Sequence, residues 1–129
     1  MTDPEQLLDK TFGLADLPVL RAIFRDCAIA VGLTDERPEE FVLAAHELLA
    51  NAIEHGGGSG QVRIFRTRAE LRCQVSDHGP GLTAASRDGT GLRIVRALAD
   101  QLNIKGTPAG TDITMAMNIP LAAHPLDLG

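Results

Sequence analysis

The sequence predicts an α+β fold, a two-layer sandwich in which about three helices cover one face of a mixed or antiparallel sheet. Two observations support this prediction. Helical spacing of apolar residues dominates residues 16–55, whereas strand-like alternation dominates residues 61–119 and is interrupted by one further helix. This order differs from the regular βαβ succession of parallel α/β proteins, which makes a parallel sheet a poor fit.

Composition limits the class of protein. At 129 residues the chain can build one domain with a hydrophobic core, and we expect a single domain over 1–129 with a hard-to-assign segment at 1–13 and a tail at 120–129. A net charge of -5 and the absence of Trp and Tyr argue against direct nucleic-acid binding. No apolar run approaches the roughly 20 residues of a membrane span. Without a signal-peptide pattern at the N-terminus, we expect a cytoplasmic protein with no membrane partner.

The first segments predict a weak strand and then a helix. Leu7 to Leu14 fits an edge strand. The helix begins at about Asp16, carries Pro18 in its first turn, and stops at Gly32. Its predicted apolar face consists of Leu20, Ile23, Phe24, Cys27, Ile29 and Val31. Cys27 and Cys73 stand far apart in apolar segments, which predicts buried thiols and neither a metal site nor a disulfide.

A second helix is predicted from Pro38 to His55, ending at the glycine run 56–60. Glu39 and Glu40 stand in its first turn, where negative charge complements the helix dipole. Its apolar stripe consists of Phe41, Ala44, Ala45, Leu48 and Ala52. Glu47 and Asn51 are four residues apart and therefore share another face of the helix.

The second half of the chain predicts a hairpin, a helix and two closing strands. The hairpin strands cover 61–67 and 70–76, with Arg68 and Ala69 in the turn, and a polar loop follows over 77–88. The helix is marked by apolar residues at Leu92, Ile94, Val95, Leu98, Ala99 and Leu102. Closing strands are predicted over 103–105 and 112–119, joined by a turn at 107–110.

Three clusters of residues have functional groups suited to ligand binding or catalysis. The first is Glu47 with Asn51, whose amide oxygen suits a hard cation such as Mg2+ and whose neighbouring carboxylate can deprotonate a hydroxyl or water. The second begins with Asp77, at a strand end, which can accept a hydrogen bond from an exocyclic amine such as that of adenine. Gly79 and Gly81 after it allow a flat ligand to approach the backbone.

The third cluster is Gly89-Thr90-Gly91-Leu92 at the start of the third predicted helix. Backbone N–H groups at a helix N-terminus form an anion site that suits phosphates. Base, metal and phosphates would thus each have a partner, so the three clusters together predict a nucleotide site. The glycine run at 56–60 is interpreted as a helix stop and turn, because no Lys-Ser or Lys-Thr follows it.

The order E-x-x-x-N, D-x-G-x-G and G-x-G-L before a helix resembles the N, G1 and G2 boxes of the GHKL ATPases, whose fold is the Bergerat fold. Within this superfamily, ELLANAIEHGG and GTGLRIVRALAD are most similar to the anti-sigma-factor serine kinases of the RsbW type. The resemblance covers roughly residues 14–119, and three boxes in order are far more specific than one glycine motif.

The resemblance implies an ATP- and Mg2+-dependent serine/threonine protein kinase. It assigns Glu47 as catalytic base and Asn51 as Mg2+ ligand. It assigns nucleotide binding to the residues of the two glycine boxes and to a late threonine that supports the adenine: Asp77, Gly79, Gly81, Gly89, Thr90, Gly91, Leu92 and Thr111. The implied partners are a STAS-domain anti-anti-sigma protein, which is phosphorylated, and a sigma factor, which is sequestered.

Several alternatives stay open at this level. Only six residues, TAASRD, separate Leu82 from Gly89, where many members have a longer lid, so a nucleotide-gated protein-binding switch with little kinase activity is one alternative. An activator kinase of the RsbT type is another. Arg87, Arg93 and Arg96 are the nearby cations for phosphate. A homodimer is compatible with the apolar face of the first helix. His46 is rejected as a phosphoacceptor, because its helix already carries the Glu47 and Asn51 pair.

Overall fold

The fold was analysed in a computed structural model, which describes residues 4–79 and 90–120. Five strands and three α-helices make up the described part, with a short 3-10 helix, η1, before the first α-helix. In chain order the elements are β1 (Glu5–Gly13), η1 (Leu14–Asp16), α1 (Leu17–Ala30), α2 (Arg37–His55), β2 (Ser59–Arg66), β3 (Glu70–Asp77), α4 (Thr90–Leu98), β4 (Gln101–Thr107) and β5 (Gly110–Asn118). The predicted loop at 80–88 and the tail from 121 lie outside the described residues.

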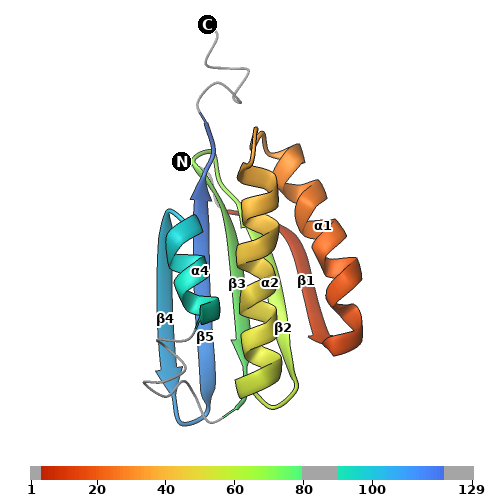
Figure 1. Cartoon of the computed structure of the whole chain (residues 1–129), viewed down its shortest axis with the longest axis vertical. Helices are drawn as coiled ribbons and strands as arrows, with labels where there is room; N and C mark the ends of the chain where they lie inside the picture. The colour runs from red at the N-terminus through yellow and green to blue at the C-terminus, as the bar shows by residue number, and fades with distance from the viewer. Residues whose placement is uncertain (1–3, 80–89, 121–129) are drawn as a thin grey trace, which may run out of the picture.

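The five strands form one sheet in the order β1-β2-β3-β5-β4, and every pairing is antiparallel. α1, α2 and α4 all lie on the same face of this sheet (Figure 1). The predicted two-layer α+β sandwich is therefore confirmed, and its sheet is antiparallel and not mixed. No helix of the described residues is both long and apolar enough to cross a membrane.

The core lies between the helices and the inner face of the sheet. Alternate residues of the strands point into it, as the hairpin prediction required, because successive side chains of a strand face opposite sides. Their buried members include Val62, Ile64, Leu71, Cys73, Val75, Ile113, Met115 and Met117. From the helices, Phe24 of α1 and Phe41 of α2 meet edge to face, with ring centroids 6.3 Å apart. This contact joins the two longest helices over the sheet.

The N-terminal predictions are confirmed except at two residues of α1. Cys27 was predicted to be buried but is only half-buried, and Ile29 is the second exception. β1 is an edge strand, paired only with β2 in the described sheet, and α1 begins directly after Asp16 and is followed by Gly32 at a φ of 104°. Ile29 was predicted on the buried face, which is wrong, because its side chain is 58% exposed. It follows the buried Leu20 by nine residues, and at about 100° per residue this places it on the opposite side of the helix.

α2 agrees with its prediction, including all five residues of its apolar stripe, which are buried. Gly56 is its C-cap, and the Gly56 amide donates to the Ala52 carbonyl oxygen at 2.7 Å. The glycine run does not stay outside regular structure, however, because β2 already begins at Ser59. Gly60 lies opposite Phe12 in the antiparallel pairing of β1 with β2. A Cβ at Gly60 would lie 2.7 Å from the Ser76 carbonyl oxygen, so close strand packing requires a glycine here.

The C-terminal helix is shorter than its apolar pattern predicts. α4 ends at Leu98, and Leu102 belongs to β4, opposite Met115 of β5. The Asp100 amide already donates to the Ala116 carbonyl oxygen at 2.9 Å, so the chain has joined the sheet before Leu102. The prediction that placed Leu102 on the helix is therefore wrong. Leu98 and Leu102 are four residues apart, a helical spacing, but tertiary pairing decides their structure.

Candidate functional site

Glu47, Asn51 and His55 lie at successive turns along one side of α2, and all three are half-buried. An adjoining side of the helix is anchored in the core by its apolar stripe. The distance along the helix from Glu47 to His55 is roughly 12 Å, at 1.5 Å per residue. The polar side of α2 is therefore long enough for contacts to different parts of one extended ligand.

The Glu47 end of this line meets the first turn of α4. A Cβ placed on Gly91 would lie 2.8 Å from Oε1 of Glu47, closer than real Cβ atoms approach an oxygen. The Glu47 carboxylate therefore occupies the space that a larger residue at position 91 would need. Backbone N–H groups in the first helical turn have no partner within the helix, so a carboxylate and an anion site are neighbours here.

The His55 end of the line meets the end of β3. A Cβ on Gly56 would lie only 2.4 Å from Cγ of Asp77, so the Asp77 side chain packs directly against the C-cap of α2. The Gly79 amide donates to Oδ1 of Asp77 at 3.0 Å. Gly79 itself packs against Gly56, where an added Cβ would lie 2.5 Å from the Gly56 Cα. Two glycines thus hold the Asp77 carboxylate in place.

Thr111 and Gly110 support Asp77 from the neighbouring strand. Thr111 pairs with Asp77 in the register of β3 and β5, so both side chains face the helix layer, and Thr111 is 4% exposed. Gly110 has a φ of 154°, and a Cβ there would lie 2.1 Å from the Asp77 carbonyl oxygen. β5 can begin this close to Asp77 only because residue 110 is a glycine.

The predicted site residues are therefore arranged along one helix. Glu47 meets Gly91 at one end, Asp77 with Gly79 and Thr111 lies at the other, and Asn51 projects from α2 between them. The Leu92 side chain is buried in the core, which leaves its backbone for ligand contact. Of Thr90 only the backbone, at the start of α4, is described. Gly81, Gly89 and Arg87 lie outside the described residues.

A sequence model of the histidine kinase-like ATPase domain matches residues 12–117, most of the chain. The chain belongs to this family. The predicted membership of the GHKL superfamily is thereby confirmed, and the described fold agrees with it. No curated protein sequence gives a significant match.

Solved structures with the same fold include relatives from three bacteria. The structure of the RsbU and RsbW domains of Rv1364c from Mycobacterium tuberculosis superposes with a TM-score of 0.69 at 23% identity, over 92% of this chain and 34% of that one. The Acinetobacter baumannii histidine kinase AdeS superposes with a TM-score of 0.57 at 15% identity, over 89% of this chain and 69% of that one. The histidine kinase domain of the Erythrobacter litoralis EL346 blue-light activated histidine kinase superposes with a TM-score of 0.53 at 19% identity, over 95% of this chain and 70% of that one.

These likenesses show the fold of the histidine kinase-like ATPase domain. The chain spans about a third of the Rv1364c chain that it matches. The activities and partners of the longer proteins therefore do not pass to this chain by similarity alone.

The donor set of this histidine kinase-like ATPase domain fits Mg2+ better than a transition metal. The described residues contain no group of three or more His, Cys, Asp or Glu side chains that could hold an ion. A half-buried amide oxygen on Asn51, one turn from the Glu47 carboxylate, suits an ion that keeps several waters and takes few protein ligands. His46 points elsewhere, since its Nδ1 lies 3.4 Å from Nη1 of Arg21 on α1.

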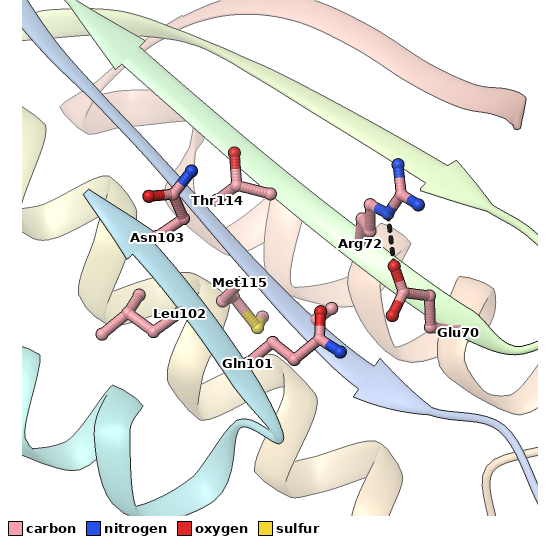
Figure 2. Close-up of a pocket in the computed structure, with 8 residues that line it drawn as sticks. Glu70, Arg72, Gln101, Leu102, Asn103, Thr114 and Met115 are labelled. Carbon is pink, nitrogen blue, oxygen red and sulfur yellow. Dashed lines mark hydrogen bonds and ion pairs between the residues drawn. The ribbon is translucent and has the colours of Figure 1, made fainter. Parts of the chain in front are cut away.

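The described residues line two hollows that bear on the location of the nucleotide site. One, of about 310 Å³, lies at the end of the strands and is lined in part by Asp77, Gly110 and Thr111. The other, of about 350 Å³, lies over β3, β5 and β4, where Asn103 and Thr114 are neighbours and Nε of Arg72 donates to Glu70 at 2.5 Å (Figure 2). None of the predicted site residues lines this second hollow, so the chemistry argues for the first as the one related to the nucleotide.

Gly56 and Gly110 are supporting residues that sequence reasoning missed. Gly56 was interpreted only as a helix stop, and Gly110 only as part of a turn. Both prove to be the residues whose lack of a side chain lets α2 and β5 close on Asp77. Gly110 stands directly before Thr111 in the sequence, and this adjacency was the one available signal.

Proposed function

We propose that this domain is an ATP- and Mg2+-dependent serine/threonine protein kinase that phosphorylates a STAS-domain anti-anti-sigma protein. Membership of the histidine kinase-like ATPase family supports nucleotide binding. The observation that carries the proposal is the line along α2, with a carboxylate at the first turn of α4 and a second carboxylate at the end of β3. Serine specificity and the partner are the steps beyond this observation.

At the β3 end, Asp77 would accept a hydrogen bond from the adenine amino group. Its Oδ1 already accepts from the Gly79 amide, which fixes the orientation of the carboxylate. Gly56 and Gly79 add no side chains around it, so a flat base can approach the backbone. Thr111, buried beside Asp77, would complete the base pocket.

At the α4 end, the phosphates would lie near the first turn of the helix, where Gly91 and its neighbours present backbone N–H groups. The amide oxygen of Asn51 would hold Mg2+. When bound, this ion supplies positive charge that offsets the charge of the phosphates. The cationic candidates described nearby on α4 are Arg93 and Arg96.

Glu47 would act as the general base. Its carboxylate accepts the proton of the partner serine while the serine oxygen forms a bond to the γ-phosphorus and the bond from that phosphorus to the ADP oxygen breaks. A half-buried position suits this role, because the carboxylate is partly shielded from water yet open to an incoming hydroxyl. The products are phosphoserine and ADP.

The resemblance of ELLANAIEHGG and GTGLRIVRALAD to the anti-sigma-factor serine kinases of the RsbW type supports a role in sigma-factor control. On this proposal the domain binds a sigma factor when the STAS protein is already phosphorylated, and releases it when the unphosphorylated STAS protein is available. The same surface of the domain need not serve both partners.

The test combines the purified protein, labelled ATP, Mg2+ and the STAS protein encoded nearby. Transfer of label to a serine is the expected result. A Glu47→Ala protein should bind ATP like the wild type yet transfer about 10²-fold to 10⁴-fold less label, the usual contribution of a general base. Full activity of this variant would remove Glu47 from the base role.

A nucleotide-gated binding switch is the second candidate. It is favoured by the six-residue segment between Leu82 and Gly89, which is short for closing over a triphosphate. ATP-dependent complexes with the STAS protein or a sigma factor, formed without any transfer of label, would support the switch over the kinase. Stimulation of a downstream regulator by the wild type would instead indicate an activator of the RsbT type.

A further inference from the structure

Arg37, the first residue of α2, contacts two points near the end of α4 that lie more than 60 residues away in the sequence. Its Nη1 donates to the Leu98 carbonyl oxygen at 2.9 Å, and its Nη2 donates to Oδ2 of Asp100 at 2.9 Å. Nη1 also lies 2.9 Å from Oε1 of Glu40 on the same helix. One guanidinium therefore joins the start of α2 to the junction between α4 and β4.

The Leu98 carbonyl is one of the last of α4, and such carbonyls have no partner within their own helix. A cation there also complements the negative end of the helix dipole. Asp100 is itself held by the sheet, since its Oδ2 accepts from the Asn118 amide at 2.7 Å. Arg37 thus caps α4 and ties the cap to the sheet.

The other end of α4 meets the same helix. Gly91 packs against Glu47, ten residues after Arg37, and α4 runs antiparallel beside α2 (Figure 1). Between the two contacts, Leu92 and Val95 of α4 are buried in the core. α4 is therefore held against α2 at both ends, and the position of its C-terminal cap constrains the position of Gly91 along Glu47.

We propose that Arg37 and Asp100 are positioning residues for phosphoryl transfer. They hold α4 at the level along α2 where its first turn meets the Glu47 carboxylate. The inference rests on the proposed function only for its effect on catalysis. The effect on the order of α4 follows from the contacts themselves, because loss of a charged hydrogen-bonded cap loosens the helix that it caps.

The chain offers a matched control in the ion pair of Arg25 and Glu39. It joins α1 to α2 through two contacts, of 2.5 Å and 2.9 Å, and its side chains are 42% and 61% exposed. Like the pair of Arg37 and Asp100, it links α2 to another part of the fold, but it joins α2 to α1 and not to the end of α4. Breaking it tests whether any loss of an ion pair on α2 has the same consequences.

The experiment compares Arg37→Gln and Asp100→Asn with Arg25→Gln. Hydrogen exchange of the α4 amides from Ile94 to Leu98 should be about tenfold faster in the first two variants, the factor expected for loss of a charge-assisted hydrogen bond. It should be unchanged in Arg25→Gln. The maximal rate of phosphate transfer should fall about fivefold to tenfold with little change in the KM for the STAS protein, a split that general destabilisation would not produce.

Two further variants keep the test decisive. Arg37→Lys retains one charge for the Leu98 carbonyl and should restore part of both effects. The double variant Arg37→Gln, Asp100→Asn should lose no more than Arg37→Gln alone, because that single variant already removes the contact with Asp100. Exchange or maximal rates within twofold of Arg25→Gln would overturn the positioning role. If the wild type transfers no phosphate, the kinase proposal fails by itself, and amide exchange still decides whether Arg37 and Asp100 position α4.

Discussion

Gly91→Ala should separate stability from activity. The added Cβ would lie 2.8 Å from Oε1 of Glu47, about 0.6 Å inside the 3.4 Å at which ordinary contact begins. The clashing atom is the end of a flexible side chain, so Glu47 can rotate away at low cost to the fold. Alanine is also the better helix former, by about 1 kcal/mol. The free energy of unfolding should therefore stay equal or rise by up to about 1 kcal/mol.

Activity should move in the opposite direction. A misplacement of about 1 Å can cost about 10²-fold in rate, so a shift of the Glu47 carboxylate by about 0.6 Å should lower the rate of transfer roughly tenfold. Single-turnover transfer from labelled ATP to the STAS protein measures this rate, and urea unfolding measures the stability. ATP affinity, measured by calorimetry, should change less than the rate.

The Glu47→Gln background provides the control. If Gly91 acts through the Glu47 carboxylate, adding Gly91→Ala to this background should lower the residual rate by less than twofold, because the displaced base is already absent. An equal loss in both backgrounds would refute the reasoning and indicate a backbone effect. Unchanged transfer by Gly91→Ala alone would refute it as well.

Three other predictions concern the far end of the site and the core. Gly110→Ala should destabilise the fold by roughly 3 kcal/mol in urea unfolding, because its Cβ would lie 2.1 Å from a backbone oxygen at a φ of 154°; a loss below about 1 kcal/mol would contradict this. Asp77→Asn should weaken ATP binding in calorimetry about tenfold or more, through loss of a charged acceptor, and equal affinity would exclude the adenine contact. Burial raises the pKa of the Cys73 thiol above its ordinary value. The contribution of the protonated thiol to the free energy of unfolding is therefore complete below about pH 8.5 and declines as the pH rises further. Urea unfolding at pH 7 and 9.5 should show a smaller decline in Cys73→Ala than in the wild type, and equal declines would contradict this.

Periodicity along the chain determined the layers of this protein. The alternating apolar residues of the hairpin form one continuous apolar face only if the segment is a strand. The apolar stripe beginning at Phe41 forms such a face only if the segment is a helix. Each pattern therefore predicts its secondary structure without tertiary information. The spacing of the three boxes likewise predicted the nucleotide-binding family, since glycines and carboxylates at those positions have few other common uses.

Tertiary structure decided what periodicity leaves ambiguous. Leu102 keeps helical spacing from Leu98, yet it pairs with Met115, because hydrogen bonds to β5 begin at Asp100. Ile29 is apolar, yet it lies on the far side of α1 from the core. For Leu102 a strand partner distant in the sequence outweighed the local pattern, whereas the period of α1 itself places Ile29, nine residues after Leu20, away from the core.

The site divides in the same way. The sequence by itself predicted which residues would carry the chemistry, because Glu47, Asn51 and Asp77 have the functional groups that the proposed reaction needs. Only the tertiary structure showed what holds them: glycines at 56 and 110 that close on Asp77, and Arg37 reaching the end of α4. The physical reason is that close approach and capping depend on distances between segments far apart in the chain, and a linear pattern contains no such distance.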